Sequence, residues 1–202
     1  MMRFAQLISI VAHPLFMPVY TVLLIFNFNP YVQVQVSDDL QKLVLLVLTV
    51  CTIVLPLITA FVMQRFGLIN SLFMKTAEER KWPFLFSILW FYLGFEVLTK
   101  LPLPKSLYLL MIGALVILFI AHAITLRWKI SIHMLGIGGL IGALIGLSQR
   151  FQYDHLIMIS IVVLLAGFIG YARLKTNSHN FQQVYAGFII GLIIEWMVTF
   201  LL

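Results

Sequence analysis

The sequence predicts an all-α protein, a polytopic transmembrane helical bundle with a single integral membrane domain over residues 1–202, and three observations support this. Hydrophobic residues make up 62% of the chain and charged residues 10%, whereas soluble domains are nearer half apolar and a quarter charged. The mean hydropathy is +1.08. The apolar residues also gather into about seven segments, and we expect six to seven of them to span a bilayer.

The first predicted span runs from Ala5 to Phe26. Arg3 precedes it, as in a signal peptide, but Pro14 and Pro18 interrupt the apolar run and no cleavage site of small residues follows, so we expect a retained helix. His13 would lie inside the membrane beside Pro14, which frees a backbone carbonyl. For His13 we favour a hydrogen bond to another helix over a role in lining an active site.

Six further segments are predicted to cross the membrane: 42–62, 84–98, 107–126, 129–147, 155–171 and 181–202. Residues 27–40 form a polar loop, and residues 65–83 are too polar to span. Glycines recur at every fourth position in the fifth span and continue in the last one (Gly138, Gly142, Gly146, Gly187 and Gly191). A face of small residues lets another helix approach closely, so these two spans are expected to contain a close helix contact.

Counting crossings places four segments on one side of the membrane: the N-terminus, the loop before the third span, the start of the fifth span, and the loop between the sixth and seventh. That side collects most of the basic residues and three histidines: Arg3, Arg65, Lys75, Arg80, Lys81, Arg127, Lys129, Arg173, Lys175, His122, His133 and His179. The other side carries Asp38, Asp39, Asp154, Lys42, Lys100, Lys105 and Arg150. A bias of cations is common in membrane proteins, but it does not explain the histidines.

The net charge of +6 suits an anionic lipid headgroup or a phosphate better than nucleic acid, because the basic residues are scattered between apolar runs. Cys51 stands alone, so we expect no disulfide framework and no cysteine-rich metal site. Glu195 lies within the last span, where a carboxylate is a candidate functional residue, although it is also compatible with a protonated side chain or a place near the opposite interface.

Spacing within the polar segments predicts a phosphate site. Lys129 and His133 are four residues apart, which places both on one helical face, with Ser131 near the helix start, where backbone amides favour an anion. His179 and Gln183 are also four apart, so the Gln183 carbonyl can accept a proton from His179 and hold one tautomer.

A histidine held in this way can act as a nucleophile toward phosphorus. His133 can then give a proton to the leaving oxygen, and Arg173 can clamp the phosphoryl oxygens with its planar fork of donors. In-line attack on phosphorus then depends mainly on positioning and positive charge, and it needs no metal.

The stretch from Arg173 through His179 to Gln183 resembles the third motif of the type 2 phosphatidic acid phosphatase superfamily, Ser-Arg-x5-His-x3-Asp. This motif often continues into Ala-Gly, as Ala186 and Gly187 do here.

Ser131, Ile132 and His133 resemble the Ser-Gly-His of the second motif. A loose match to the first motif, Lys-x6-Arg-Pro, comes from Lys75, Arg80 and Pro83.

The resemblance implies hydrolysis of a lipid phosphate or a polyprenyl pyrophosphate without metal or other cofactor, through a phosphohistidine on His179 oriented by Gln183, with His133 as the general acid. It assigns phosphate binding to Arg173, Ser131, and Lys75 or Arg80, and Lys129 is a further candidate cation. The expected partner is a membrane lipid phosphate in the bilayer, with no nucleic acid. We expect a multi-pass protein of a bacterial inner membrane, and the sequence predicts no oligomeric state.

Three departures from these motifs leave an alternative open. Ala172 replaces the serine of the third motif, Ile132 replaces the glycine of the second, and Gln183 stands where an aspartate would orient the histidine. These changes favour a catalytically degenerate homologue that binds anionic lipid or assists membrane assembly. A small transporter is disfavoured because the chain shows no internal repeat and its polar groups cluster at one end of the bundle.

Overall fold

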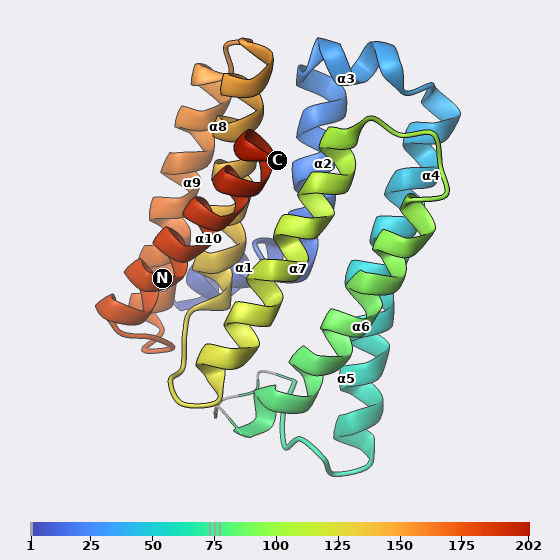
Figure 1. Ribbon diagram of the computed structural model, residues 1–202. Coiled ribbons are helices and arrows are strands. Elements are labelled where there is room, and N and C mark those ends of the chain that lie inside the picture. Colours follow the sequence, from blue (N-terminus) through green and yellow to red (C-terminus); the bar gives the residue numbers. More distant parts are fainter. Residues whose placement is uncertain (1, 73, 75, 77) are drawn as a thin grey trace.

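The computed structural model describes residues 2–72, 74, 76 and 78–202, and within these residues all regular secondary structure is helical (Figure 1). Among the described residues, seven segments are long and apolar enough to cross a membrane, which confirms the predicted multi-pass bundle. They are Leu7–Phe28, Asp38–Arg65, Glu78–Leu98, Lys105–Thr125, Ile132–Phe151, Leu156–Lys175 and Phe181–Leu201.

The α-helices in chain order are α1 (Met2–Val11), α2 (Met17–Phe28), α3 (Pro30–Gln35), α4 (Asp38–Leu48), α5 (Leu55–Arg65), α6 (Lys81–Leu98), α7 (Lys105–Thr125), α8 (Ile132–Phe151), α9 (Leu156–Lys175) and α10 (Phe181–Leu201). Two single turns of 3-10 helix, η1 (Pro14–Phe16) and η3 (Glu78–Arg80), precede α2 and α6. A π-helical stretch, η2 (Thr49–Val54), joins α4 to α5 into one long segment.

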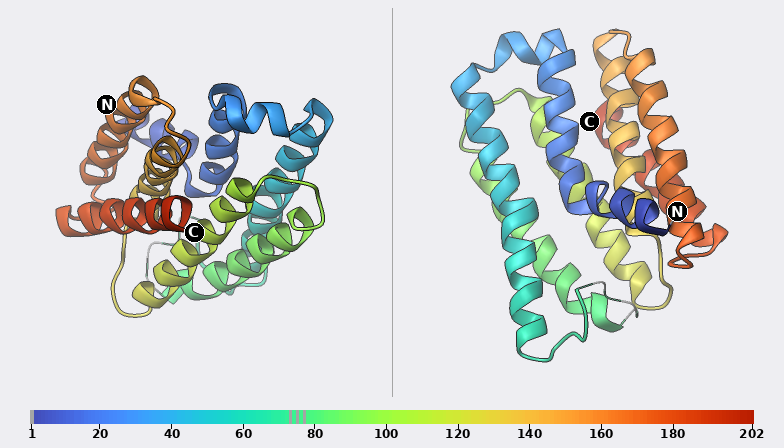
Figure 2. Two further views of the ribbon diagram at one scale, coloured as in Figure 1. Left: turned by 45° about the horizontal axis from the view of Figure 1, so that its top comes forward. Right: turned by 180° about the vertical axis from the view of Figure 1, so that it is seen from behind.

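The first predicted span consists of two helices with different directions. His13 has extended backbone angles (φ −64°, ψ 136°), and Pro14 opens η1 directly after it. Proline disfavours helical geometry in the residue before it and cannot donate a backbone hydrogen bond. The first predicted span, residues 5–26, corresponds to Leu7–Phe28, but the chain is broken at His13 and Pro14. Helix α1 runs across the bundle, whereas α2 runs along it (Figure 2).

Helix α8 lies at the centre of the bundle. In its apolar window 72% of residues are buried, against 22–33% in the other six segments. One apolar core packs mainly between α2, α4, α6 and α7, and a second joins α8 to α2, α9 and α10. His133 therefore lies on the most buried helix, α8. His179 lies just before α10, which packs against α8.

Glycines hold α8 against α10, as their spacing predicts. A Cβ at Gly138 or Gly142 would collide with backbone atoms of Phe188 or Leu192, and a Cβ at Gly191 would collide with the Leu135 carbonyl. The two backbones therefore touch, and any larger residue would push the helices apart. This contact fixes the start of α8 beside the start of α10.

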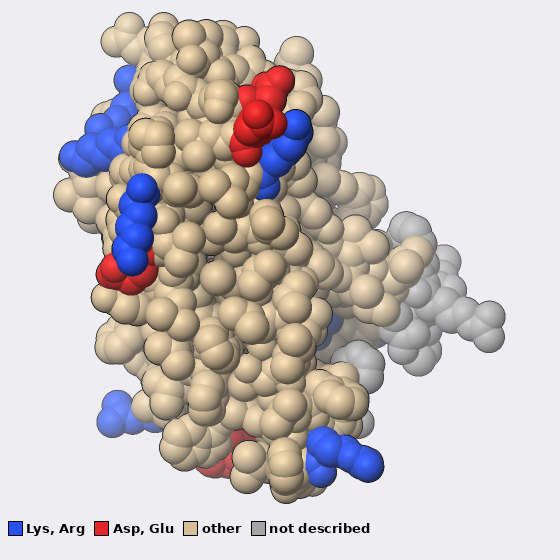
Figure 3. Space-filling model, turned by 90° about the vertical axis from the view of Figure 1, so that its right-hand side faces the viewer, with Lys and Arg blue, Asp and Glu red and all other residues tan. Residues whose placement is uncertain are grey.

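The face of the molecule seen in Figure 3 is mostly uncharged, with a few scattered charged side chains. Many large apolar side chains are exposed along the helices, including Leu57, Phe61 and Phe119. Such a surface suits contact with lipid chains and not with water. It agrees with an integral membrane protein.

The start of α8 differs from the prediction. Helix α7 ends at Thr125, and residues 126–131 form a turn followed by extended chain, so α8 begins at Ile132 with Ser131 as its N-cap. Lys129 lies before the helix, and the argument that Lys129 and His133 share a helical face is wrong. The α7–α8 connection still brings Lys129 to the same end of the bundle as His133.

Candidate functional site

A cavity of ≈ 1050 Å³ extends from the lower end of the bundle in Figure 1 into its apolar interior. Its wall draws on α1, α2, the α5–α8 helices, and the connection between α9 and α10. Most wall residues are apolar, and the basic and imidazole side chains in the wall are His13, Arg80, Lys129, His133, Arg173 and His179. A cavity of this size can take a phosphorylated headgroup together with part of an apolar chain.

His179 belongs to the connection between α9 and α10, two residues before α10 begins. Asn180 caps the helix: its side chain accepts a hydrogen bond from the Gln183 N–H (2.9 Å), and the Gln183 Oε1 accepts one from the Asn180 N–H (3.2 Å). This capping box holds the Gln183 amide in place. The same Oε1 lies 3.0 Å from the His179 Nδ1, as the spacing of four predicts.

This contact determines the tautomer of His179. Because Gln183 Oε1 already accepts a backbone N–H, it must also accept from His179, so the proton sits on Nδ1 and Nε2 carries the lone pair. Burial lowers the pKa of His179 from 6.5 to about 4, assisted by Arg80, Arg173 and Lys129 and opposed by the Gln183 hydrogen bond. At neutral pH the ring is therefore neutral, with Nε2 left for a group in the cavity.

His133 lies in the first turn of α8 and is 7% exposed. Its Nε2 lies 3.0 Å from the backbone carbonyl oxygen of Ser9, which can only accept, so Nε2 carries a proton. Its Nδ1 is buried and has no hydrogen-bond partner in the described part of the chain. In the neutral ring Nδ1 therefore carries the lone pair, and His133 can give a proton to a ligand only after taking up a second proton on Nδ1.

The two arginines of the cavity donate to neutral oxygens. Arg80, 5% exposed, donates to the carbonyls of Met74 (3.0 Å) and Ile130 (3.3 Å). Arg173 donates from a terminal nitrogen to the Ser9 hydroxyl (2.9 Å), and its Nε is buried with no partner among the described residues. Neither guanidinium forms a salt bridge with a described carboxylate, although the charge of the neighbouring Glu79 stabilises that of Arg80. An anion bound beside these two buried cations would stabilise them further.

Lys129 adds a third cation to the cavity wall. Burial lowers its pKa, and the charges of Arg80 and Arg173 lower it further. Three cations that repel one another and share one cavity create a strong positive potential. The arrangement suits a ligand with more than one negative oxygen, such as a phosphoryl group.

Other residues of the predicted site lie outside the cavity wall or outside the described residues. Gln183 acts through His179, as described above. Ser131 is fully buried, its hydroxyl has no hydrogen-bond partner within the described chain, and it is absent from the cavity wall. Its backbone N–H donates to the Gln183 carbonyl (3.3 Å), which connects the start of α8 to the start of α10. Lys75 falls outside the described residues.

Three further residues lie at the cavity: Ser9, which the sequence did not single out, and His13 and Glu195, which it did. His13, for which we favoured a structural role, lies in the wall with its ring centroid 5.5 Å from that of His133. Ser9 contacts both His133 and Arg173. Glu195 also reaches the cavity wall, with its carboxyl group packed against Gly113, where only a glycine leaves room for it.

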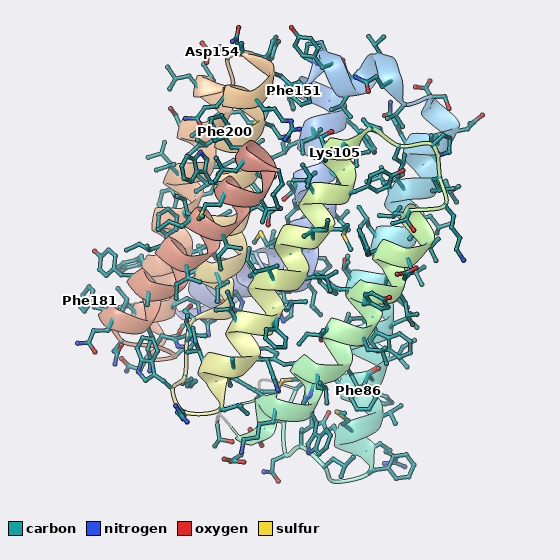
Figure 4. The ribbon with its side chains drawn as sticks, viewed as in Figure 1. Phe86, Lys105, Phe151, Asp154, Phe181 and Phe200 are labelled. Carbon is teal, nitrogen blue, oxygen red and sulfur yellow. The ribbon has the colours of Figure 1, made fainter. Side chains whose placement is uncertain are left out.

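The opposite end of the bundle is built differently. Asp154 and Lys105 lie toward that end, whereas Phe181 marks the start of α10 near the cavity end and points away from the bundle (Figure 4).

Within the described residues, no group of three or more His, Cys, Asp or Glu side chains is arranged to hold a metal ion.

No family model, curated protein or solved structure matches the chain. The geometry of the cavity is therefore the basis for a functional interpretation.

Proposed function

We propose that this protein is a lipid-phosphate phosphatase-like membrane enzyme that hydrolyses a lipid phosphate or a polyprenyl pyrophosphate through a phosphohistidine on His179, without a metal. The observation that carries the proposal is the geometry of His179, whose Nδ1 is bound to Gln183 and whose Nε2 is left for a ligand, in a cavity wall that also holds Arg80, Lys129 and Arg173. The proposed setting is a bacterial inner membrane.

In the proposed reaction His133 starts as an imidazolium, with a second proton taken up on Nδ1 when the anionic phosphate binds. The lone pair of His179 Nε2 attacks phosphorus, the bond from phosphorus to the lipid oxygen breaks, and His133 gives the leaving oxygen its Nδ1 proton. The His179 Nδ1–H stays hydrogen-bonded to Gln183. Water then attacks the phosphohistidine, His133 takes a proton from that water, and the phosphorus–nitrogen bond breaks. Inorganic phosphate leaves, and both histidines return to their starting states.

Arg80, Lys129 and Arg173 supply the positive charge that binds the phosphoryl oxygens. Their charge is most valuable when negative charge shifts onto those oxygens, in a site with little water. The apolar part of the cavity would accept the first part of the lipid chain, so the headgroup can reach His179 while the tail remains among the helices.

The test is release of inorganic phosphate from short-chain phosphatidate and from farnesyl pyrophosphate by the purified protein in detergent. We expect His179→Ala to lower the rate by at least about 10³-fold, as removal of a nucleophile does in other covalent mechanisms. His155→Ala is the control, because it removes a histidine outside this cavity. Full activity of His179→Ala would refute the catalytic assignment.

The second candidate function is binding of an anionic lipid, or membrane assembly, without turnover. The amide of Gln183 favours it, since an amide orients His179 but does not stabilise an imidazolium as a carboxylate does. Tight binding of short-chain phosphatidate by a folded wild-type protein, with no phosphate release and no phosphohistidine, would select this alternative.

A further inference from the structure

The N-terminal helix takes part in the cavity, although the resemblance assigns no role to this part of the chain. The Ser9 carbonyl accepts the His133 Nε2–H at 3.0 Å, and the Ser9 hydroxyl accepts from Arg173 at 2.9 Å. Ser9 of α1 therefore contacts two side chains that take part in the proposed reaction, His133 and Arg173. The position of α1 is part of the geometry of the site.

His13 follows α1 at the break before Pro14, and its ring lies in the cavity wall. Its ring meets the His133 ring edge to face, with centroids 5.5 Å apart and planes at 78°. The His13 Nδ1 accepts a hydrogen bond from the Leu15 N–H (3.4 Å), which caps η1. Because Nδ1 accepts, the neutral ring carries its proton on Nε2.

We propose that His13 is a further phosphate-binding residue, whose Nε2–H donates a hydrogen bond to a non-bridging oxygen of the phosphoryl group held between His133, Arg173 and His179. This inference rests on the proposed function, because it names the group that the cavity binds. A fixed donor aimed at an oxygen that gains negative charge lowers the barrier, and removing one such donor typically slows a reaction by about 10²–10³-fold.

The break between α1 and α2 gives this role a structural basis. The extended conformation of His13 and the start of η1 at Pro14 turn the chain inside the membrane, at the depth of His133. A histidine in a continuous helix would lack the capping contact that holds Nδ1. The turn therefore orients the ring and leaves its second nitrogen for a ligand.

Two substitutions separate phosphate binding from capping. His13→Asn keeps an acceptor at the position of Nδ1, so it can cap Leu15, but its side chain is too short to place a donor where Nε2 lies. His13→Gln places its amide N–H₂ near the position of Nε2 and loses the cap. Phosphate release from short-chain phosphatidate, inhibition by orthovanadate and thermal unfolding are measured for both variants and the wild type.

We expect His13→Asn to unfold at the wild-type temperature, lose about 10-fold or more in rate and bind vanadate correspondingly more weakly. His13→Gln should retain most of the rate even if it unfolds earlier. The reverse ranking, an active His13→Asn and an inactive His13→Gln, would overturn the inference and leave capping as the role of His13.

A second measurement uses the unmodified protein. Diethyl pyrocarbonate modifies accessible neutral imidazoles, and modification of His13 is quantified by mass spectrometry with and without orthovanadate. Protection of His13 by vanadate supports the inference, whereas equal modification contradicts it.

The wild-type protein also separates the two proposals. If the wild-type protein binds short-chain phosphatidate without releasing phosphate, the proposal of hydrolysis is overturned but the inference about His13 is not. The inference is then decided by binding: it holds if His13→Asn binds phosphatidate more weakly than His13→Gln, and it fails if the order is reversed. Absence of both hydrolysis and binding overturns both proposals.

Discussion

The two ends of the bundle carry similar kinds of charged residue in opposite environments. Far from the cavity, Lys42 and Asp39 form a salt bridge of 3.1 Å with side chains that are 76% and 95% exposed. At the cavity, Arg80 is 5% exposed and donates only to backbone carbonyls in the described chain. An exposed pair contributes little to stability, whereas a buried cation without a counter-ion is retained where an anion binds.

This difference shows that the number of charges is less informative than their burial and their partners. Both ends would look polar in a simple count along the sequence. The cavity is distinguished by arginines that donate to neutral oxygens and by imidazoles whose ring nitrogens are held by specific acceptors.

After loss of the nucleophile His179, the largest expected effect comes from removing an arginine of the cavity. Arg173→Ala should lower phosphate release by about 10²–10³-fold, because it removes a charged donor from the phosphoryl oxygens. Arg150→Ala is the matched control: like Arg173, Arg150 donates from a terminal nitrogen to a neutral oxygen, here the Thr199 carbonyl (3.1 Å), but it lies outside the cavity wall. Equal loss in both variants would mean that the arginines matter only for the fold.

The pH dependence of the rate should report the lowered pKa of His179. Because its pKa is about 4, below the ordinary 6.5, the nucleophile stays neutral as the pH falls through 6.5. The limb of the pH–rate profile that belongs to His179 should lie near pH 4, below which the rate falls about tenfold per unit. The unfolded chain takes up this proton near pH 6.5, so the stability contributed by His179 declines between pH 6.5 and 4. A His179 limb at pH 6.5 would contradict its burial among cations.

A carboxylate in place of the orienting amide should raise activity. Gln183→Glu keeps the length of the side chain, adds a negative charge beside the His179 Nδ1–H, and should raise the rate by about tenfold, since the reverse change is strongly deleterious in a serine-enzyme triad. The same charge should move the acid limb to higher pH. The control is Gln182→Glu, an exposed neighbour that also adds one charge. If Gln183→Glu leaves the rate unchanged, or if Gln182→Glu raises it equally, this role is excluded.

A substitution in the glycine contact between α8 and α10 is expected to change the reaction rate least. It should clearly lower the stability of the fold. Gly142→Ala should lower the free energy of unfolding by about 1–3 kcal/mol, because its Cβ would collide with the Leu192 carbonyl. Gly167→Ala has open space around the new Cβ and should be neutral or slightly stabilising. Denaturant titration in detergent micelles measures both. Equal stability of the two variants would show that the close contact is not required.

Hydropathy predicted the seven segments within a few residues, because long apolar runs have few alternatives to spanning helices. The His179–Gln183 contact was also predictable, because it depends on neighbours along one helix start. The helical face assigned to Lys129 was wrong because local spacing does not reveal where α7 ends and α8 begins. The contacts of Ser9 and the place of His13 depend on how α1 crosses the bundle, which only long-range packing decides.

The most direct test of the central claim, that polar segments from distant parts of the chain form one site for phosphoryl transfer, is the position of a covalent label. Wild-type protein is incubated with ³²P-labelled short-chain phosphatidate, quenched in alkali to preserve phosphohistidine, and mapped by mass spectrometry. We predict phosphate on His179, and no label in His179→Ala. Phosphate release by a wild-type protein that never carries the label, or a label that persists in His179→Ala, would contradict the account.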